Sequence, residues 1–192
     1  RLAEALATVL DAESLARGLE LYVETYNALS DEMTARKFGF PQPTEPDLEL
    51  ARQAYALMHF SELDFSWFFR ALPEADLAAL EACSYDLQRW QERRDEWQDW
   101  LQRYQQRLQQ LGEPLAVRQA RMESCNPQFV MRNHLVQVAI ERAEQGDPSR
   151  IWELLQAARH PYRSRPLDDP QIQKRPEWAR NKPGCSMLSC SS

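Results

Sequence analysis

The sequence has few glycines, and no two of them lie close together. The five glycines among the 192 residues are Gly18, Gly39, Gly112, Gly146 and Gly184. A loop that holds phosphate groups with its backbone N–H groups needs several glycines within a few residues. This spacing excludes a self-contained nucleotide-binding loop of the known kinds within the chain.

Histidine is scarce as well, and the histidines are scattered. The sequence contains three, His59, His134 and His160, and none has a partner at metal-ligand spacing. His134 lies among apolar positions of an expected helix, which is typical of a buried or half-buried histidine. No elbow motif presents a nucleophilic serine, so a hydrolase triad has no support. These patterns give no residue of the chain a catalytic, cofactor-binding or metal-binding role.

Positive charge is limited and does not gather in one region. The 23 lysines and arginines are outnumbered by 29 aspartates and glutamates, which gives a net charge of -6 at pH 7. A surface that neutralises phosphates needs clustered lysine and arginine, whereas here arginine is interleaved with acidic residues. We therefore expect no nucleic-acid partner.

Long apolar runs and a signal region are also missing. No run reaches the roughly 18 apolar residues that a membrane-spanning helix needs, and no basic-then-apolar segment opens the sequence. We expect a soluble protein with no membrane partner. Arg1 lies inside an expected helix without an initiator methionine or a capping residue, so we expect a piece of a longer polypeptide whose remainder precedes it.

Apolar residues and tryptophan are plentiful enough for a sizeable core. Apolar residues make up 43% of the sequence, and six residues are tryptophan. The twelve prolines gather mainly at residues 41–46 and 161–183, which leaves long stretches without a helix breaker. No strand pattern or repeat stands out. The sequence predicts an all-α fold of helical hairpins or a bundle, followed by an irregular C-terminal tail.

Apolar residues recur at steps of three and four in a series of segments, as on the buried face of a helix. The expected helices cover residues 1–10, 12–37, 48–60, 65–72, 73–83, 86–111, 115–124, 126–147 and 148–159. The segment 86–111, which is as long as 12–37, carries a tryptophan, tyrosine and leucine stripe interleaved with arginine. Such a stripe could stack on bases, but at helical spacing it is more typical of a core.

The segment 126–147 has the clearest end signals. Asn126 is a favourable N-cap, Pro127 suits the first helical position, and the run closes at Gly146. The sequence therefore predicts one helix that begins at Asn126.

The four cysteines divide into two pairs. Cys83 and Cys125 stand at the ends of expected helices, which is typical of buried free thiols. Cys185 and Cys190 lie in a Pro-rich segment, 161–192, which we expect to be a flexible tail behind a helical region, 1–160. A disulfide between the two tail cysteines, or to another cysteine, is sterically accessible. The tail offers too few ligands for zinc, and it is either a redox or tethering element or an inert end.

Several stretches carry a specific combination of residues. They are NPQFVMRNHLVQVAIERAEQGD, KRPEWA, the terminal CSS, LELYVETYNALSDEMTARKFGF and LELARQAYALMHFSELDFSWFFRAL. The first three resemble the C-terminal region of the selenoprotein O (SelO) family, the protein adenylyltransferases with a pseudokinase fold. The last two are similar to the helical segments that follow the kinase-like core in that family.

The resemblance implies an enzyme that binds ATP with Mg2+ and transfers AMP to Ser, Thr or Tyr hydroxyls of protein substrates. It also implies that the residues for nucleotide, metal and catalysis belong to a kinase-like core upstream of Arg1, which would be the partner of these helices in cis. The family resemblance further implies a compartment, which would be the cytoplasm in bacteria or the mitochondrion in eukaryotes. The alternative is a stand-alone helical interaction module with incidental cysteines.

One functional position follows from the resemblance. Some family members have selenocysteine immediately before the final two serines, and Cys190 occupies that place in this sequence. The resemblance implies that Cys190 forms a regulatory disulfide, either with Cys185 or with a cysteine of the upstream core.

Overall fold

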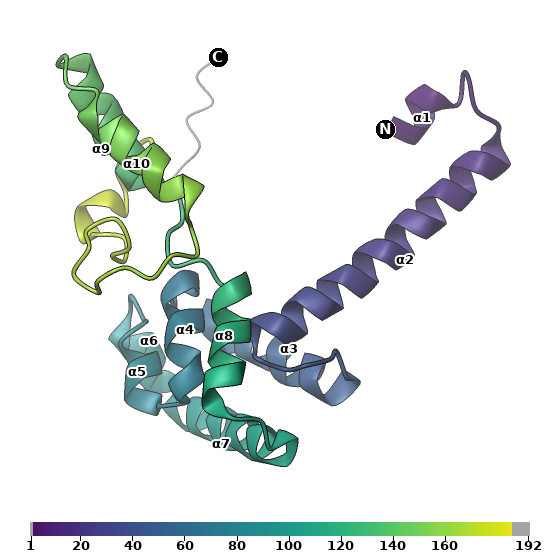
Figure 1. Cartoon of the computed structure of the whole chain (residues 1–192), viewed down its shortest axis with the longest axis horizontal. Coiled ribbons are helices and arrows are strands. Elements are labelled where there is room, and N and C mark those ends of the chain that lie inside the picture. The colour runs from purple at the N-terminus through teal and green to yellow at the C-terminus, as the bar shows by residue number, and fades with distance from the viewer. Residues whose placement is uncertain (1, 186–192) are drawn as a thin grey trace.

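The computed structural model of the chain describes residues 2–185 and shows an all-helical protein (Figure 1). The helices of this part are α1 (Leu2–Leu6), α2 (Ala12–Lys37), α3 (Glu45–Phe60), α4 (Phe65–Ala71), η1 (Leu72–Glu74), α5 (Leu77–Glu81), α6 (Leu87–Glu92), α7 (Arg94–Leu111), α8 (Leu115–Cys125), α9 (Asn133–Glu144), α10 (Ser149–Arg159) and η2 (Glu177–Ala179). No β-strand occurs within residues 2–185, although Leu63 and Ser84 form an isolated bridge. The predicted all-α fold is confirmed. None of the described helices is both long and apolar enough to cross a bilayer.

Several helix boundaries lie where their end signals predict them. Helix α2 has the predicted bounds, and the Asp11 side chain caps it by accepting a hydrogen bond of 2.8 Å from the Ser14 backbone N–H. Helices α8 and α10 agree with prediction to within a residue. Gly112 ends α7 in the left-handed conformation, with a φ of 61°, and Gly146 follows α9 with a φ of 87°.

The helix predicted over 126–147 is wrong in its first turns. Asn126 ends α8 rather than capping the next helix, since its backbone N–H bonds the Met122 carbonyl at 2.8 Å. Its buried side chain accepts from Lys37 Nζ at 2.7 Å and donates to the Lys37 carbonyl at 3.0 Å. These bonds fix Asn126 to the end of α2, so α9 begins only at Asn133.

Two other predicted helices are divided. The segment 86–111 breaks at Arg93, whose φ is −120° and whose guanidinium lies 4.5 Å from the centre of the Phe60 ring. The segment 73–83 becomes η1, a turn at the left-handed Ala75, and α5, because the Asp76 side chain caps a new helix through the Ala79 N–H at 2.8 Å.

The main core is aromatic and lies where the end of α2 meets α3, α4 and α7. The side chains at most 2% exposed there include Phe38, Phe40, Phe68, Phe69, Trp90, Trp97, Trp100 and Tyr104. The predicted core role of the stripe in 86–111 is thus confirmed. Two of the indole N–H groups are hydrogen-bonded inside the core, because Trp97 Nε1 donates to Ser61 at 3.1 Å and Trp100 Nε1 donates to the Leu50 carbonyl at 2.8 Å.

A second, smaller core lies in a hairpin of α9 and α10, away from the aromatic core (Figure 1). Its members are Phe129, Leu135, Ala139, Leu154, Ala157 and Ile172. Phe129 comes from the segment before α9 and Ile172 from the segment after α10, so both connections contribute to this core. The described chain therefore has two packed regions, each with its own apolar core.

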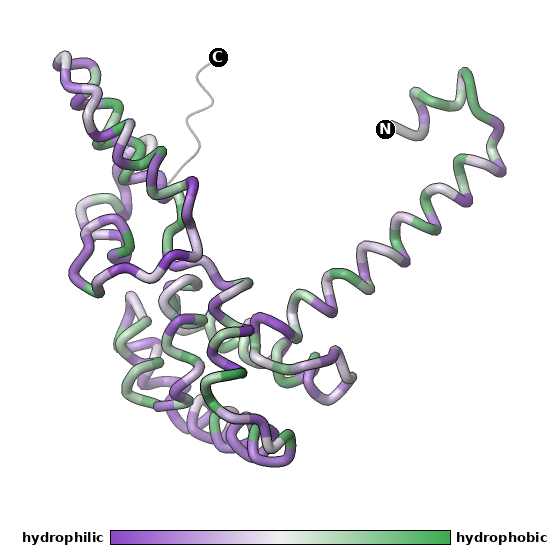
Figure 2. The backbone as a smooth tube through the Cα atoms, viewed as in Figure 1, coloured by the Kyte–Doolittle hydropathy of each residue, from purple (hydrophilic) through white to green (hydrophobic). Residues whose placement is uncertain are grey.

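Helix α2 departs from the helical hairpin that its pattern predicts. Its last turn is buried at Ala35, but its earlier turns project away from the other helices (Figure 1). Leu19, Tyr22 and Leu29 are 53%, 65% and 59% exposed. Figure 2 shows hydrophobic and hydrophilic stretches alternating along this helix turn by turn. A helix with the pattern of a core element is thus attached to the body at one end.

We expect Tyr104→Phe to lower the free energy of unfolding by about 1–2 kcal/mol, since the Tyr104 hydroxyl donates to the Phe38 carbonyl at 2.8 Å inside the core. Urea denaturation measures the change. The control is Tyr22→Phe, which removes the same hydroxyl from a side chain that is 65% exposed. Equal effects of the two substitutions would contradict the assigned role of the buried bond.

Candidate functional site

Of the two predicted tail cysteines, the structure describes one. Cys190 lies outside the described residues. The sequence predicts that Cys185 is an exposed thiol of a flexible tail, but it is a free thiol that is only 7% exposed, so that prediction is wrong. Its carbonyl accepts from Asn133 Nδ2 at 3.3 Å, at the start of α9. Gly184 precedes it with a φ of 81°, a left-handed conformation that glycine adopts without strain.

Cys185 lines a cavity of about 210 Å3 at the junction of the two packed regions. The other lining residues are Tyr85, Arg132, Asn133, His134 and Arg175. They come from the segment before α6, the start of α9 and the segment after α10. The fold thus brings a thiol, two guanidinium groups and an imidazole to one place.

The buried carboxylate of Asp64 organises this junction. Asp64 caps α4 by accepting from the Ser66 and Trp67 backbone N–H groups, both at 3.1 Å. Arg132 donates to both of its oxygens, at 2.6 Å and 2.9 Å, and the Tyr85 hydroxyl donates to it as well. The side chains of Asp64 and Arg132 are 2% and 14% exposed, so this ion pair is largely removed from water.

The surroundings shift the pKa values of the groups at this junction. Burial favours the neutral form of Asp64, but the hydrogen bonds and charge of Arg132 outweigh burial and lower the pKa of Asp64. Burial, together with the Asp64 carboxylate, raises the pKa of Tyr85 to about 12. Burial and the charges of Arg132 and Arg175 lower the pKa of His134. At neutral pH the junction therefore holds one carboxylate, two guanidinium ions and neutral Tyr85 and His134.

His134 itself is 6% exposed and lies 6.2 Å from Trp178, ring centre to ring centre, in an edge-on arrangement. The buried histidine predicted from the sequence is confirmed. Among the described residues, no group of three or more His, Cys, Asp or Glu side chains could hold a metal ion.

The segment after α10 packs along this junction as far as Cys185. The Arg175 backbone N–H donates to the Tyr85 hydroxyl oxygen at 2.8 Å. Lys174 Nζ donates to the Ala82 and Ser84 carbonyls at 2.7 Å and 2.9 Å, and Trp67 Nε1 donates to the Ile172 carbonyl at 2.7 Å. Much of the stretch assigned to a tail from its composition thus makes specific bonds to α4 and α5–α6.

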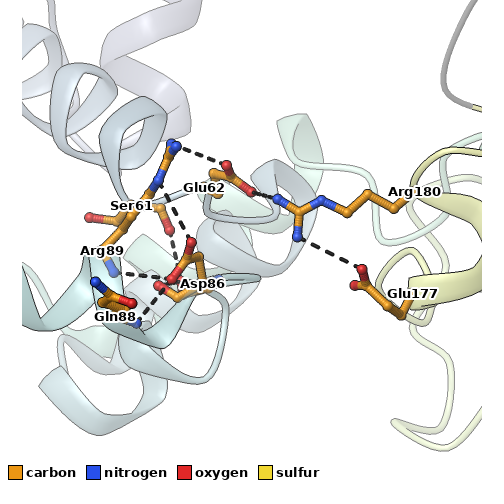
Figure 3. A network of polar contacts seen from close by, with 8 residues as sticks. Ser61, Glu62, Asp86, Gln88, Arg89, Glu177 and Arg180 are labelled. Carbon is orange, nitrogen blue, oxygen red and sulfur yellow. Dashed lines mark hydrogen bonds and ion pairs between the residues drawn. The ribbon is translucent and has the colours of Figure 1, made fainter.

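A surface network continues the same connection (Figure 3). Glu62 accepts a hydrogen bond from Arg180 at 3.1 Å on one side and forms an ion pair with Arg89 at 3.1 Å on the other. Arg89 also lies 3.6 Å from Asp86, and Arg180 lies 3.9 Å from Glu177. Each of these pairs is partly exposed, so each contributes little singly, and the network serves mainly to fix orientation.

The two remaining cysteines are buried free thiols, as predicted. Burial raises the pKa of Cys83 to about 12 and also raises the pKa of Cys125. Because the thiolate is the reactive form, both are chemically inert at neutral pH.

Sequence reasoning missed Asp64, Tyr85 and Arg132, although one signal was present. Asp64 directly precedes the apolar run of α4, which is an N-cap pattern. Its pairing with Arg132 has no local signal, because the two residues are 68 positions apart. Both oxygens of Asp64 are engaged within the junction, by Arg132, by Tyr85 and by the first turn of α4, which suits the joining of two packed regions. The described chain is accordingly a helical unit whose two packed regions are joined by these contacts.

Comparison with known proteins identifies the family. The family model described as Protein adenylyltransferase SelO matches residues 1–159. A protein nucleotidyltransferase YdiU of Xanthomonas axonopodis pv. citri is 46% identical, over 100% of this chain and 38% of the relative. Its namesakes in Azoarcus sp. and Tolumonas auensis are 42% and 41% identical, over 36% and 38% of their own lengths. The chain belongs to the SelO protein adenylyltransferase family, which confirms the resemblance, and it spans under two fifths of these relatives.

We expect Asp64→Asn to destabilise the protein by about 3–5 kcal/mol, because it leaves the largely buried Arg132 without its counter-ion. The pH dependence should change too. Since the folded pKa of Asp64 is lowered, its carboxylate stabilises the fold above its unfolded pKa of roughly 3.9, and this contribution is lost as the pH falls through the folded pKa. Urea denaturation between pH 7 and pH 3 measures both effects.

The matched control is Asp168→Asn, at an exposed carboxylate. It should leave stability and its acid dependence close to those of the wild type. An Asp64→Asn protein that keeps the wild-type loss of stability in acid would refute the assigned role of the pair.

Proposed function

We propose that the full-length protein transfers AMP from ATP to Ser, Thr or Tyr hydroxyls of protein substrates. The observation that carries this proposal is the match of the SelO adenylyltransferase family model to residues 1–159. The relatives at 41–46% identity, named protein nucleotidyltransferases, support the same reaction class.

In the proposed reaction, a substrate hydroxyl oxygen forms a bond to the α-phosphorus of ATP. The bond from that phosphorus to the bridging oxygen breaks, pyrophosphate leaves with the bonding electrons, and the hydroxyl proton passes to a base. Mg2+ and cationic side chains offset the developing negative charge. We assign these parts to a kinase-like core outside this chain, since the described residues offer no metal cluster and the glycines no phosphate loop.

In this proposal the present chain is the helical support of that core, which is its partner in cis. Two features support the assignment. The chain spans only 36–38% of the relatives quoted above, so most of a full-length relative lies outside it. Its own polar groups at the junction are engaged with one another, through Asp64, Tyr85 and Arg132. The bacterial relatives favour a location in the bacterial cytoplasm.

Incubation of the full-length protein with ATP labelled at the α-phosphorus, Mg2+ and a cell lysate tests the proposal. We expect labelled protein bands with the full-length protein and none with this chain added in its place. ATP labelled at the γ-phosphorus is the control, and it should give no bands. Label transfer by the present chain, or labelling only from the γ-phosphorus, would refute the proposed division of roles or the proposed reaction.

We further propose that Cys190 is a redox-regulatory thiol, which forms a disulfide with Cys185 or with a cysteine of the core. The position of Cys190 before Ser191 and Ser192 supports the choice of this cysteine. The burial of Cys185 makes it a less favourable partner for Cys190, because thiol–disulfide exchange requires access to the attacked sulfur. A core cysteine is therefore the favoured partner.

For the full-length protein, Cys190→Ser should leave nucleotide binding intact and abolish the response of AMP transfer to thiol reductants. Transfer rates with and without reductant measure this. The companion variant Cys185→Ser distinguishes the two possible disulfide partners of Cys190, because it removes the reductant response only if Cys185 pairs with Cys190. A reductant response that persists unchanged in Cys190→Ser would eliminate the regulatory role.

A further inference from the structure

Helix α2 carries a continuous apolar stripe that the described chain leaves exposed. The stripe consists of Leu19, Tyr22, Val23, Tyr26, Leu29 and Met33, each between 47% and 65% exposed. Contiguous apolar surface of this kind is uncommon on proteins that act as isolated monomers and marks an interaction surface.

The placement of charge on α2 shows that the stripe is built as a buried face. At 100° per residue, the six side chains fall within one sector of roughly 120°, as on helices that pack into a protein core. The acidic side chains Glu20, Glu24 and Asp31 fall on the opposite side of the helix. Along the part of α2 that projects from the body, the sequence therefore places apolar side chains on one side and acidic side chains on the other.

The base of α2 is held in a fixed direction. Ala35 and Phe38 are buried in the aromatic core, and Lys37 exchanges two hydrogen bonds with the Asn126 side chain. Lys37 Nζ also lies 4.4 Å from the centre of the Phe69 ring. An anchored base presents the stripe as a preformed surface, which lowers the entropy lost when the stripe is covered.

The width and composition of the stripe distinguish between two surfaces that could cover it, a second copy of α2 and the surface of a folded protein. A second copy pairing as a two-stranded coiled coil prefers a narrow seam of branched aliphatic side chains. Here the face is broadened by Val23 and carries the rings of Tyr22 and Tyr26, whose centres are 6.1 Å apart. Amphipathic rings of this kind suit a folded protein surface, where the ring is buried and the hydroxyl reaches a polar partner.

The lengths of the relatives indicate which folded surface could cover the stripe. The chain covers 100% of its own length in the alignment with the Xanthomonas axonopodis protein but 38% of that protein. We propose that the α2 stripe is an intramolecular docking surface, covered in the full-length protein by the folded part that lies outside this chain. The proposal holds whatever reaction that part carries out.

Two substitutions of the same kind on α2 of the full-length protein test this. Leu29 is 59% exposed and lies on the stripe, whereas Leu21 is 63% exposed and lies off it. Leu29→Glu should lower the Tm by about 3 °C or more, because it places a charge in a buried contact. Leu21→Glu should shift the Tm by less than about 1 °C, as at an exposed site. Equal shifts for the two variants would overturn the proposal.

Hydroxyl-radical footprinting of the wild-type full-length protein gives a result that does not depend on how the variants fold. After correction for intrinsic reactivity, Tyr22, Tyr26 and Met33 should be protected severalfold more than Leu21 on the same helix. Protection equal to that of Leu21 would overturn the proposal. Light scattering measures the oligomeric state and so distinguishes an intramolecular contact from a dimer. If the wild type is a dimer and Leu29→Glu is a monomer, the stripe binds a second copy of the chain, and the proposal is overturned.

Discussion

The ion pair between Asp64 and Arg132 is the contact on which the arrangement of this chain depends. It joins the cap of α4, beside the aromatic core, to the start of α9, beside the smaller core. Taking both charges out of water is costly, and the bidentate geometry, the Tyr85 hydroxyl and two backbone N–H groups offset that cost. A charge pair with this many directional bonds fixes one orientation of the two regions, which apolar contacts would leave less well defined.

Local chemistry made much of the fold predictable. Glycine at the end of α7, an aspartate cap at α2 and apolar steps of three and four are signals carried by neighbouring residues, and they placed most helices. The misplaced start of α9 has a different cause. Asn126 has every local property of an N-cap, but its side chain bonds Lys37, which is 89 positions away. Partners at such distances leave no mark in a single sequence.

The same limit applies to the candidate site. The sequence singled out Cys185 by its unstructured surroundings, and the structure buries it against α9. Composition indicates whether a segment forms regular structure, but an irregular segment can still pack, as the bonds of Lys174 and Arg175 to the turn before α6 show. Helix α2 is the converse case, because its amphipathic pattern predicts a buried face that the described residues leave exposed. Within the described residues the chain is thus two packed regions joined by buried polar contacts, with one exposed apolar helix face.

A double-mutant cycle on Asp64 and Arg132 tests this account most directly. The free energies of unfolding of Asp64→Asn, Arg132→Met and the double variant are compared with that of the wild type. The account predicts that the double variant loses less stability than the sum of the single losses, with a coupling energy of about 1–3 kcal/mol. Losses that add to within about 0.5 kcal/mol would show that the pair does not hold the two regions together, and would contradict the account.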